Sequence, residues 1–145
     1  NTSLAGSRYL RSREMPLSGR PLEFWGEAEK DFIQRALRTA RSGAASSGRA
    51  LAGGGLAAAL AKDSAESGKG AAVSLAIPTR KDVVLFGEGG ARALYSVPMG
   101  KVPLFKVIWN GYPCIPLGRV GGSTLDVEGA FSFTVEELGK KWRIR

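Results

Sequence analysis

The chain has 145 residues, of which 43% are hydrophobic and 23% are charged, so it is long and apolar enough to fold as one globular domain. It contains no histidine and a single cysteine, Cys114, which excludes histidine-based nucleophile systems, histidine-ligated metals and an intrachain disulfide. The net charge of +8 indicates an anionic partner, but the basic residues are scattered, so nucleic acid is not the expected one.

No apolar run approaches the length of a membrane-spanning helix, and a single cysteine suits a reducing compartment. We therefore expect a cytoplasmic protein with no membrane partner. The start at Asn1, without a methionine, is compatible with a processed or excised piece of a longer protein.

The first half of the chain predicts two helices. Residues 1–21 are polar, basic and interrupted by glycine and proline, which indicates an extended lead-in before a domain at 22–145. Apolar residues at helical spacing predict a helix over 22–41, ended by Ser42 and Gly43. A loop of small residues is expected over 44–53, and a second helix over 56–67.

The second half changes to short apolar runs typical of strands. We expect strands over 71–77, 83–86, 93–97, 114–120, 124–127 and 131–133, with a charged turn over 79–82. Residues 101–110 are ambiguous but carry a helical apolar face. Thr134 and Glu137 have the spacing of a capping box, which opens a last helix. The order predicts an α+β fold, with helices on one face of a mainly antiparallel sheet.

Three consecutive glycines, Gly53, Gly54 and Gly55, run directly into the second predicted helix. Glycine allows a close backbone approach, and the amides at a helix start favour an anion, so this turn is suited to hold a phosphate. The alternative is a flexible Gly/Ala loop.

The stretch L-F-G-E-G-G-A-R at 85–92 is the strongest candidate for chemistry. Glu88 is suited to accept from a ribose hydroxyl or to hold Mg²⁺, and Arg92 to bind a phosphate through two hydrogen bonds. The alternative is a hairpin turn in which the two side chains form a structural ion pair. Asp63 and Glu66 are expected in solvent, and the charged group at 27–31, which includes Glu29, as a helix surface.

An ordered set of motifs covers nearly the whole chain. They are L-A-G-S-R-Y-L at 4–10, E-x-E-K at 27–30, G-G-L-A-A-A-L-A at 54–61, G-K-G-A-A-V-S-L at 68–75, L-F-G-E-x-x-x-R at 85–92, L-G-x-V-G-G-S-T-L-x-V at 117–127 and V-E-E-L-x-x-x-W at 135–142. In this order they resemble the C-terminal domain of PurL-type phosphoribosylformylglycinamidine synthases, within the aminoimidazole ribonucleotide synthetase superfamily.

The resemblance implies a domain of an ATP-dependent C–N ligase of purine biosynthesis. It would form one wall of a nucleotide and substrate cleft, beside an N-terminal domain that binds most of the ATP and Mg²⁺. A glutaminase subunit supplies ammonia in this family, and the substrate is a phosphorylated ribonucleotide. The implied binding residues are Ser7, Glu88, Gly89, Gly90 and Arg92, and no residue of this chain is assigned as catalytic.

One motif departs from the family pattern. The family has H-D-x-S-D-G-G-L where this chain has R-A-L-A-G-G-G-L at 49–56, so the histidine, both aspartates and the serine are absent. An anion there would be held by the amides of Gly53–Gly55 and by Arg49. The alternative function is therefore a degenerate, non-catalytic copy that acts as a structural or interaction subunit of a larger assembly.

Overall fold

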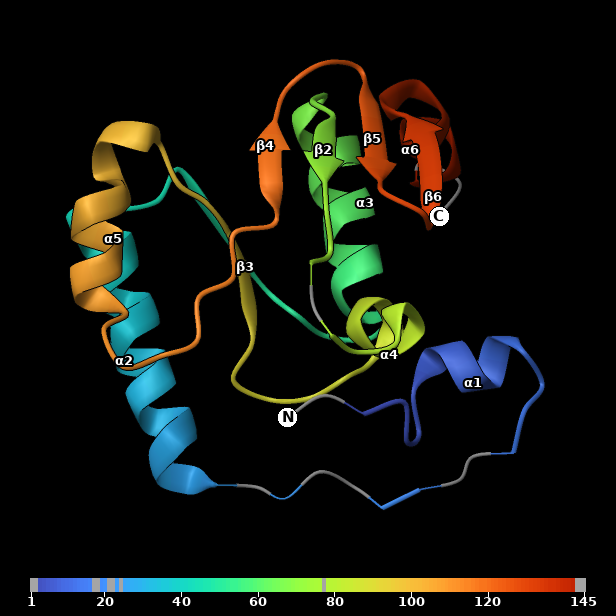
Figure 1. Cartoon of the computed structure of the whole chain (residues 1–145), viewed down its shortest axis with the longest axis horizontal. Coiled ribbons are helices and arrows are strands. Elements are labelled where there is room, and N and C mark those ends of the chain that lie inside the picture. The colour runs from blue at the N-terminus through green and yellow to red at the C-terminus, as the bar shows by residue number, and fades with distance from the viewer. Residues whose placement is uncertain (1–2, 17–18, 21–22, 24, 77, 143–145) are drawn as a thin grey trace.

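The computed structural model describes residues 3–16, 19–20, 23, 25–76 and 78–142. Short helices and strands follow one another along the chain (Figure 1). In chain order they are α1 (Arg8–Ser12), α2 (Gly26–Ser42), β1 (Ser47–Ala50), α3 (Gly55–Ser67), β2 (Ala71–Val73), α4 (Lys81–Phe86), β3 (Ala93–Ser96), the 3₁₀ turn η1 (Met99–Lys101), α5 (Val102–Ile108), β4 (Gly118–Val120), β5 (Thr124–Val127), β6 (Phe131–Thr134) and α6 (Val135–Trp142).

The strands form two separate sheets. A four-stranded sheet has the order β4-β2-β5-β6, in which only the β2–β5 pair is parallel. The other sheet is an antiparallel ribbon of β1 and β3. In Figure 1, α3 lies behind the four-stranded sheet and α6 lies next to β6. The prediction of an α+β fold with a mainly antiparallel sheet is confirmed.

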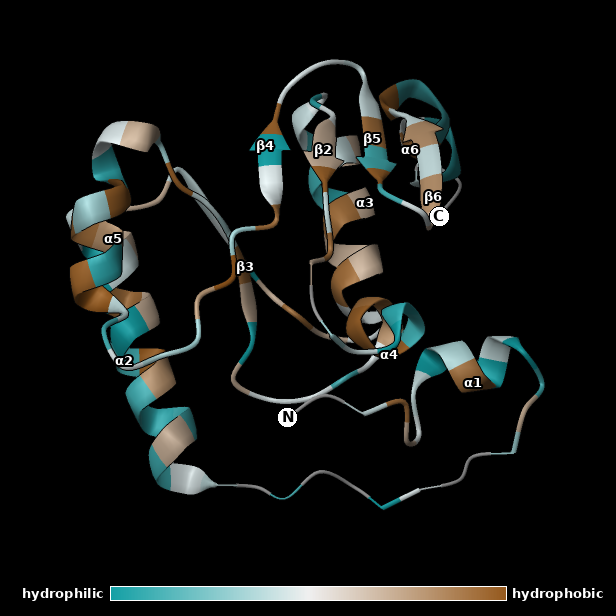
Figure 2. Ribbon diagram, in the orientation of Figure 1, coloured by the Kyte–Doolittle hydropathy of each residue, from teal (hydrophilic) through white to brown (hydrophobic). Residues whose placement is uncertain are grey.

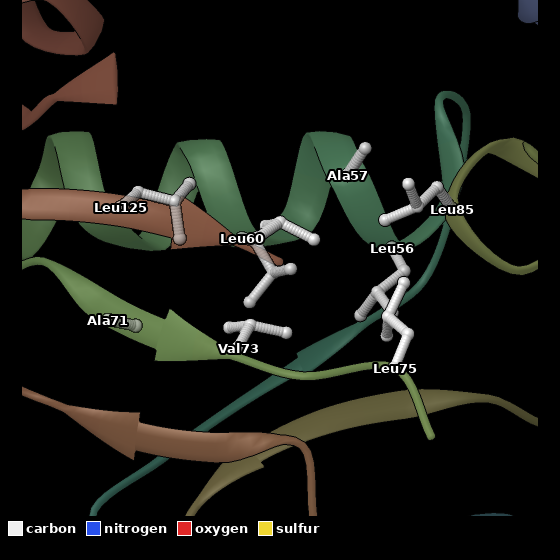
Figure 3. Close-up of a cluster of buried hydrophobic side chains, with 9 residues drawn as sticks. Leu56, Ala57, Leu60, Ala71, Val73, Leu75, Leu85 and Leu125 are labelled. Atoms are coloured by element: carbon white, nitrogen blue, oxygen red, sulfur yellow. The ribbon is translucent and has the colours of Figure 1, made fainter. Parts of the chain in front are cut away.

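The main hydrophobic core lies between α3 and the four-stranded sheet (Figure 3). Strand residues alternate, so that Ala71 and Val73 are buried while Ala72 is exposed, and Leu125 is fully buried. Helix α3 is rich in alanine and leucine and is apolar along much of its length (Figure 2). The small alanine side chains allow the helix to approach the sheet closely. The buried members are Leu56, Ala57, Leu60, Ala71, Val73, Leu75, Leu85, Leu125 and Val127.

A second, aromatic core joins α2, α5 and β3. Its buried members are Ala44, Ile108 and Trp109, with Phe32, Ala36, Tyr95, Phe105 and Tyr112 packed around them. Strand β3 alternates between the two cores, because Leu94 packs on the main core and Tyr95 on the aromatic one. Gly48 lies opposite Tyr95, and a Cβ there would come within 2.6 Å of the Tyr95 ring. The β1–β3 ribbon therefore connects the two cores.

Two elements in the N-terminal half were predicted wrongly. Residues 8–12 form helix α1 instead of an extended segment, because the buried Ser7 side chain accepts a hydrogen bond from the N–H of Leu10. Residues 47–50 form β1 instead of a loop, because they pair with β3. Helix α2 begins at Gly26, while the predicted start at residue 22 and the proposed boundary between 21 and 22 lie outside the described residues.

The strand predicted at 83–86 is also wrong, since these residues belong to helix α4. The Asp82 carboxylate accepts the N–H of Val83 in the first turn, which favours a helix over the predicted charged turn at 79–82. A four-residue apolar run fits either a strand or a buried helix turn by its periodicity. The strand predicted at 114–120 is shortened to β4, and the ambiguous segment at 101–110 contains α5.

The strand predicted at 71–77 is shortened to β2 at Ala71–Val73, and residue 77 lies outside the described residues. The other elements agree closely with the predictions. Helix α3 starts one residue earlier than predicted, and Gly68, in a left-handed conformation, caps its C-terminal end. Strands β3, β5 and β6 lie within a residue of their expected bounds. The capping box is formed, because the N–H of Glu137 donates to Thr134 Oγ1 and the Thr134 N–H donates to the Glu137 carboxylate. Among the described helices, none is both long and apolar enough to cross a membrane.

Candidate functional site

Glu88 lies just after α4 and joins three segments that are distant in sequence. Its Oε1 accepts the backbone N–H of Gly54 at 2.8 Å and that of Arg8 at 2.9 Å. Its own N–H donates to the carbonyl oxygen of Ser3 at 2.9 Å. The segments at 3–8, 53–55 and 87–92 therefore meet at one half-buried carboxylate, and these are three of the segments that carry the family motifs.

The glycine turn is tightly constrained where it enters α3. Gly54 and Gly55 have φ values of +89° and +64°, which side chains other than glycine rarely adopt. A Cβ at Gly55 would lie 2.6 Å from the carbonyl oxygen of Leu85 and 2.7 Å from that of Gly87. The alternative of a flexible loop does not hold for this turn, because it packs directly against the end of α4. The Glu88 carboxylate lies at the positive end of the α3 dipole.

Arg92 turns back onto its own loop. Its guanidinium donates to the carbonyl oxygen of Gly87 at 3.0 Å and, over a longer distance of 3.5 Å, to that of Val84. Burial lowers the pKa of Arg92 from its ordinary value. Glu88 and Arg92 are both described residues, and no ion pair joins them, so the alternative of a structural Glu–Arg pair is not what the structure shows.

Ser7 lies beside this cluster but is fully buried. Its hydroxyl oxygen accepts the N–H of Leu10 and thereby caps α1. The neighbouring Arg8 side chain covers Gly53, where a Cβ would lie 2.6 Å from Arg8 Nε. The structure therefore brings the exposed Arg8 guanidinium to the glycine turn. Arg8 was not among the site residues predicted from the sequence.

Arg49 has its partners further along α3. It forms ion pairs with Asp63 and Glu66, the two carboxylates that were expected in solvent. The hydrogen bond with Asp63 is the main reason that the pKa of Arg49 is raised. Strand β1 places Arg49 on the same side of the ribbon as Leu94, which faces the main core. These contacts fasten the ribbon to α3 and leave the Arg49 side chain engaged there.

The second half of the 87–92 loop is held by α2. Glu29 Oε2 accepts the N–H of Ala91 at 3.2 Å, and a Cβ at Gly90 would lie 2.1 Å from Glu29 Oε1. Gly89 is half-buried next to it, and Gly90 is exposed. The sequence predicts only a helix surface for Glu29, because an acidic residue in a first turn has the same pattern whether or not it binds a distant loop.

The donor groups of these residues suit a nucleotide or phosphate better than a metal held by this chain alone. Within the described residues, no group of three or more Asp, Glu, Cys or His side chains has the spacing of a metal site. The exposed Arg8 guanidinium is suited to bind anionic oxygens, whereas the N–H groups of Gly54 and Ala91 already donate to carboxylates of this chain. A Mg²⁺ ion at this face would need further ligands from another domain or from a nucleotide.

Comparison with known proteins identifies the chain as a domain-sized relative of a larger protein. No family model matches it. It is 38% identical over 152 aligned residues to the phosphoribosylformylglycinamidine synthase subunit PurL of Anaeromyxobacter dehalogenans, and 33% identical over 146 to that of Moorella thermoacetica. Each match covers 97% of this chain and 20% of the relative, so the chain spans about a fifth of the length of these curated relatives. Both relatives are PurL subunits, so the resemblance drawn from the motifs is confirmed.

Solved structures agree at the level of the fold. The PurLQS structure from Thermotoga maritima matches with a TM-score of 0.68 and 21% identity, over 86% of this chain and 23% of that one. The T. maritima PurL complexed with FGAR matches with a TM-score of 0.62 and 20% identity, over 77% of this chain and 21% of that one. At these identities the likeness establishes the shared α+β fold.

Proposed function

We propose that the chain acts as the C-terminal domain of an ATP-dependent phosphoribosylformylglycinamidine synthase and forms one wall of its nucleotide and substrate cleft. The observation that carries this proposal is the similarity to PurL over 97% of the chain, in which the motif-bearing segments meet at Glu88. The division into a lead-in at 1–21 and a domain at 22–145 belongs to the same proposal.

The ligand-facing rim is formed by the three segments around the Glu88 carboxylate. Gly53, Gly89 and Gly90 offer backbone close to the surface, while Arg8 adds a positive charge above Gly53. Ser7, Arg49 and Arg92 support this rim through their own contacts with α1, α3 and the loop. The rim is thus proposed to consist of Gly53, Gly54, Gly55, Glu88, Gly89 and Gly90, with Ser7, Arg49 and Arg92 as its supporting residues.

The partners follow from this role. The N-terminal domain of the same enzyme would bind most of the ATP and Mg²⁺. ATP supplies the phosphoryl group that activates the amide of the ribonucleotide. A glutaminase subunit would supply ammonia, and one of the similar solved structures is that of PurLQS from T. maritima.

A second candidate function is a non-catalytic copy of the domain within a larger assembly. The stretch at 49–53 has no carboxylate, and the two nearest on α3, Asp63 and Glu66, are paired with Arg49. In addition, the Glu88 carboxylate already lies against the Gly54 amide at the start of α3. The Arg49 guanidinium and the Gly54 amide therefore already bind carboxylates of the same chain, which favours a structural role over ligand binding.

A chimera tests whether this domain completes a ligand site. The matching fifth of A. dehalogenans PurL is replaced by this chain, and binding of formylglycinamide ribonucleotide and of a non-hydrolysable ATP analogue is measured by calorimetry. We expect both ligands to bind within about tenfold of unmodified PurL, a difference of about 1.4 kcal/mol. A folded chimera that binds neither ligand overturns the proposal.

A further inference from the structure

We propose that Glu29 on α2 is a positioning residue for the loop at 87–92, which it holds in the conformation that presents Glu88 and Gly89 to a ligand. The proposal rests on the proposed function for its ligand, while the contact itself is a property of this chain. Glu29 is not among the residues assigned to the site above.

The geometry at Glu29 is specific to the backbone of this loop. Its Oε2 accepts the Ala91 N–H at 3.2 Å, across 62 residues of sequence. Ala91 has a φ of +48°, a conformation that a residue with a Cβ adopts only when its surroundings hold it there. The carboxylate of Glu29 supplies such a restraint at the strained residue itself.

Gly90 fits beneath the same carboxylate because it has no side chain. A Cβ there would lie 2.1 Å from Glu29 Oε1 and 3.1 Å from Glu29 Cδ. Gly90 thus leaves room for the Glu29 side chain, and the next residue, Ala91, donates a hydrogen bond to it.

Helix α2 is a firm support for this contact. On the turn that carries Glu29, the carbonyl oxygen of Ala28 accepts the hydroxyl of Tyr112 at 2.9 Å. Further along, Arg35 donates to the carbonyl oxygens of Ile108 and Asn110 at the end of α5. A side chain on a helix anchored in this way holds its partner more exactly than a side chain on a free loop.

The loop is consequently held at two ends by two carboxylates. Glu88 ties it to the start of α3, on the main core, and Glu29 ties it to α2, on the aromatic core. Removing the carboxylate of Glu88 or that of Glu29 releases only the end of the loop that this carboxylate holds. Loss of Glu29 is therefore expected to loosen Gly90 and Ala91 without unfolding the domain.

Amide hydrogen exchange of the whole chain, followed by NMR, tests the contact. We expect Glu29→Ala to raise the exchange rate of the Ala91 amide roughly tenfold, as for loss of one charge-assisted hydrogen bond. Glu27→Ala is the matched control, because Glu27 lies in the same first turn and is exposed. Glu29→Gln keeps an acceptor and is expected to restore most of the protection. An unchanged Ala91 rate in Glu29→Ala, or an equal rise in Glu27→Ala, overturns the proposal.

The role in ligand binding is tested separately in the PurL chimera. We expect Glu29→Ala to weaken ribonucleotide binding about tenfold, with Glu29→Gln close to the parent and Glu27→Ala unchanged. If Glu29→Ala loosens Ala91 but binds the ribonucleotide as tightly as the parent chimera, the positioning role is wrong. If the parent chimera itself binds no ribonucleotide, the proposed function fails, whereas the exchange experiment still decides whether Glu29 holds the loop.

Discussion

Glu88 Oε1 accepts the backbone N–H of Gly54 at 2.8 Å, so the protein's own carboxylate lies at the first turn of α3. The same oxygen accepts the Arg8 N–H. A turn whose sequence suggests a phosphate cradle is therefore already supplied with a negative charge from within the fold. Glu88 is first of all a structural link between three motif-bearing segments, and any contact with a ligand is additional to that role.

Replacing Glu88 tests this structural role. Glu88→Ala removes the acceptor of two backbone amides, and we expect the free energy of unfolding to fall by about 2–3 kcal/mol in urea titrations. Glu136→Ala is the control, because the Glu136 side chain is 76% exposed and, among the described residues, pairs with Lys140 alone, and it should change stability by less than about 0.5 kcal/mol. Equal effects of the two substitutions would show that the Glu88 contacts add nothing.

Gly55→Ala tests the close packing of the glycine turn against α4. The new Cβ would meet the carbonyl oxygens of Leu85 and Gly87 at a φ of +64°, so we expect a loss of about 3 kcal/mol or more. Gly139→Ala provides a matched glycine control in α6, where no atom of the described residues lies within 4 Å of an added Cβ. That change should stabilise the helix by about 0.5–1 kcal/mol. Thermal unfolding of both variants measures the difference, and a Gly55→Ala protein as stable as the parent contradicts the geometry.

The capping box of α6 predicts a pH dependence of stability. Hydrogen bonds from the Thr134 N–H and hydroxyl lower the pKa of Glu137 below its ordinary value of 4.5. Because the folded pKa is the lower one, the stabilisation is complete above about pH 4.5 and is lost as the pH falls through the folded pKa. Urea unfolding from neutral pH down to about pH 3 should show this loss in the parent protein and a smaller one in Glu137→Gln. Identical pH profiles would refute the assignment.

The aromatic core depends on a buried polar pair. Trp109 Nε1 donates to Thr39 Oγ1 at 2.8 Å, and Thr39 is 1% exposed. Thr39→Val keeps the shape but leaves the indole N–H without its acceptor, so we expect a loss of about 1–3 kcal/mol. Thr39→Ser retains the hydroxyl and should lose less, which tryptophan fluorescence during unfolding can measure. A larger loss in Thr39→Ser than in Thr39→Val would mean that packing of the methyl group dominates.

Long periodic elements and their ends could be predicted from the sequence, as α3 and the capping box of α6 show. The run at 83–86 could not, because four apolar residues fit a strand and a buried helix turn equally, and the position of Leu85 in the main core decided the outcome. Strand β1 was missed for a related reason, since its small and charged residues pair with β3 only through tertiary contacts.

In the candidate site, too, some features could be predicted from the sequence and others depend on tertiary contacts. Glycine content and the L-F-G-E motif located the segments at 53–55 and 87–92, which do meet. The roles of Glu29 and Arg8 depend on contacts with residues far along the chain, which no local pattern reports. The pairing of Arg49 with Asp63 and Glu66 was missed for the same reason, because strand and helix packing alone bring them together.

Turnover by the PurL chimera that carries this chain tests directly whether the chain serves as a domain of a synthase. With ammonium chloride as the nitrogen source, ATP-dependent formation of the amidine product is measured against unmodified A. dehalogenans PurL. We expect turnover within about a hundredfold of that enzyme, or about 2.7 kcal/mol in activation free energy. A folded chimera that binds both ligands but forms no product would contradict the synthase assignment and favour the non-catalytic alternative.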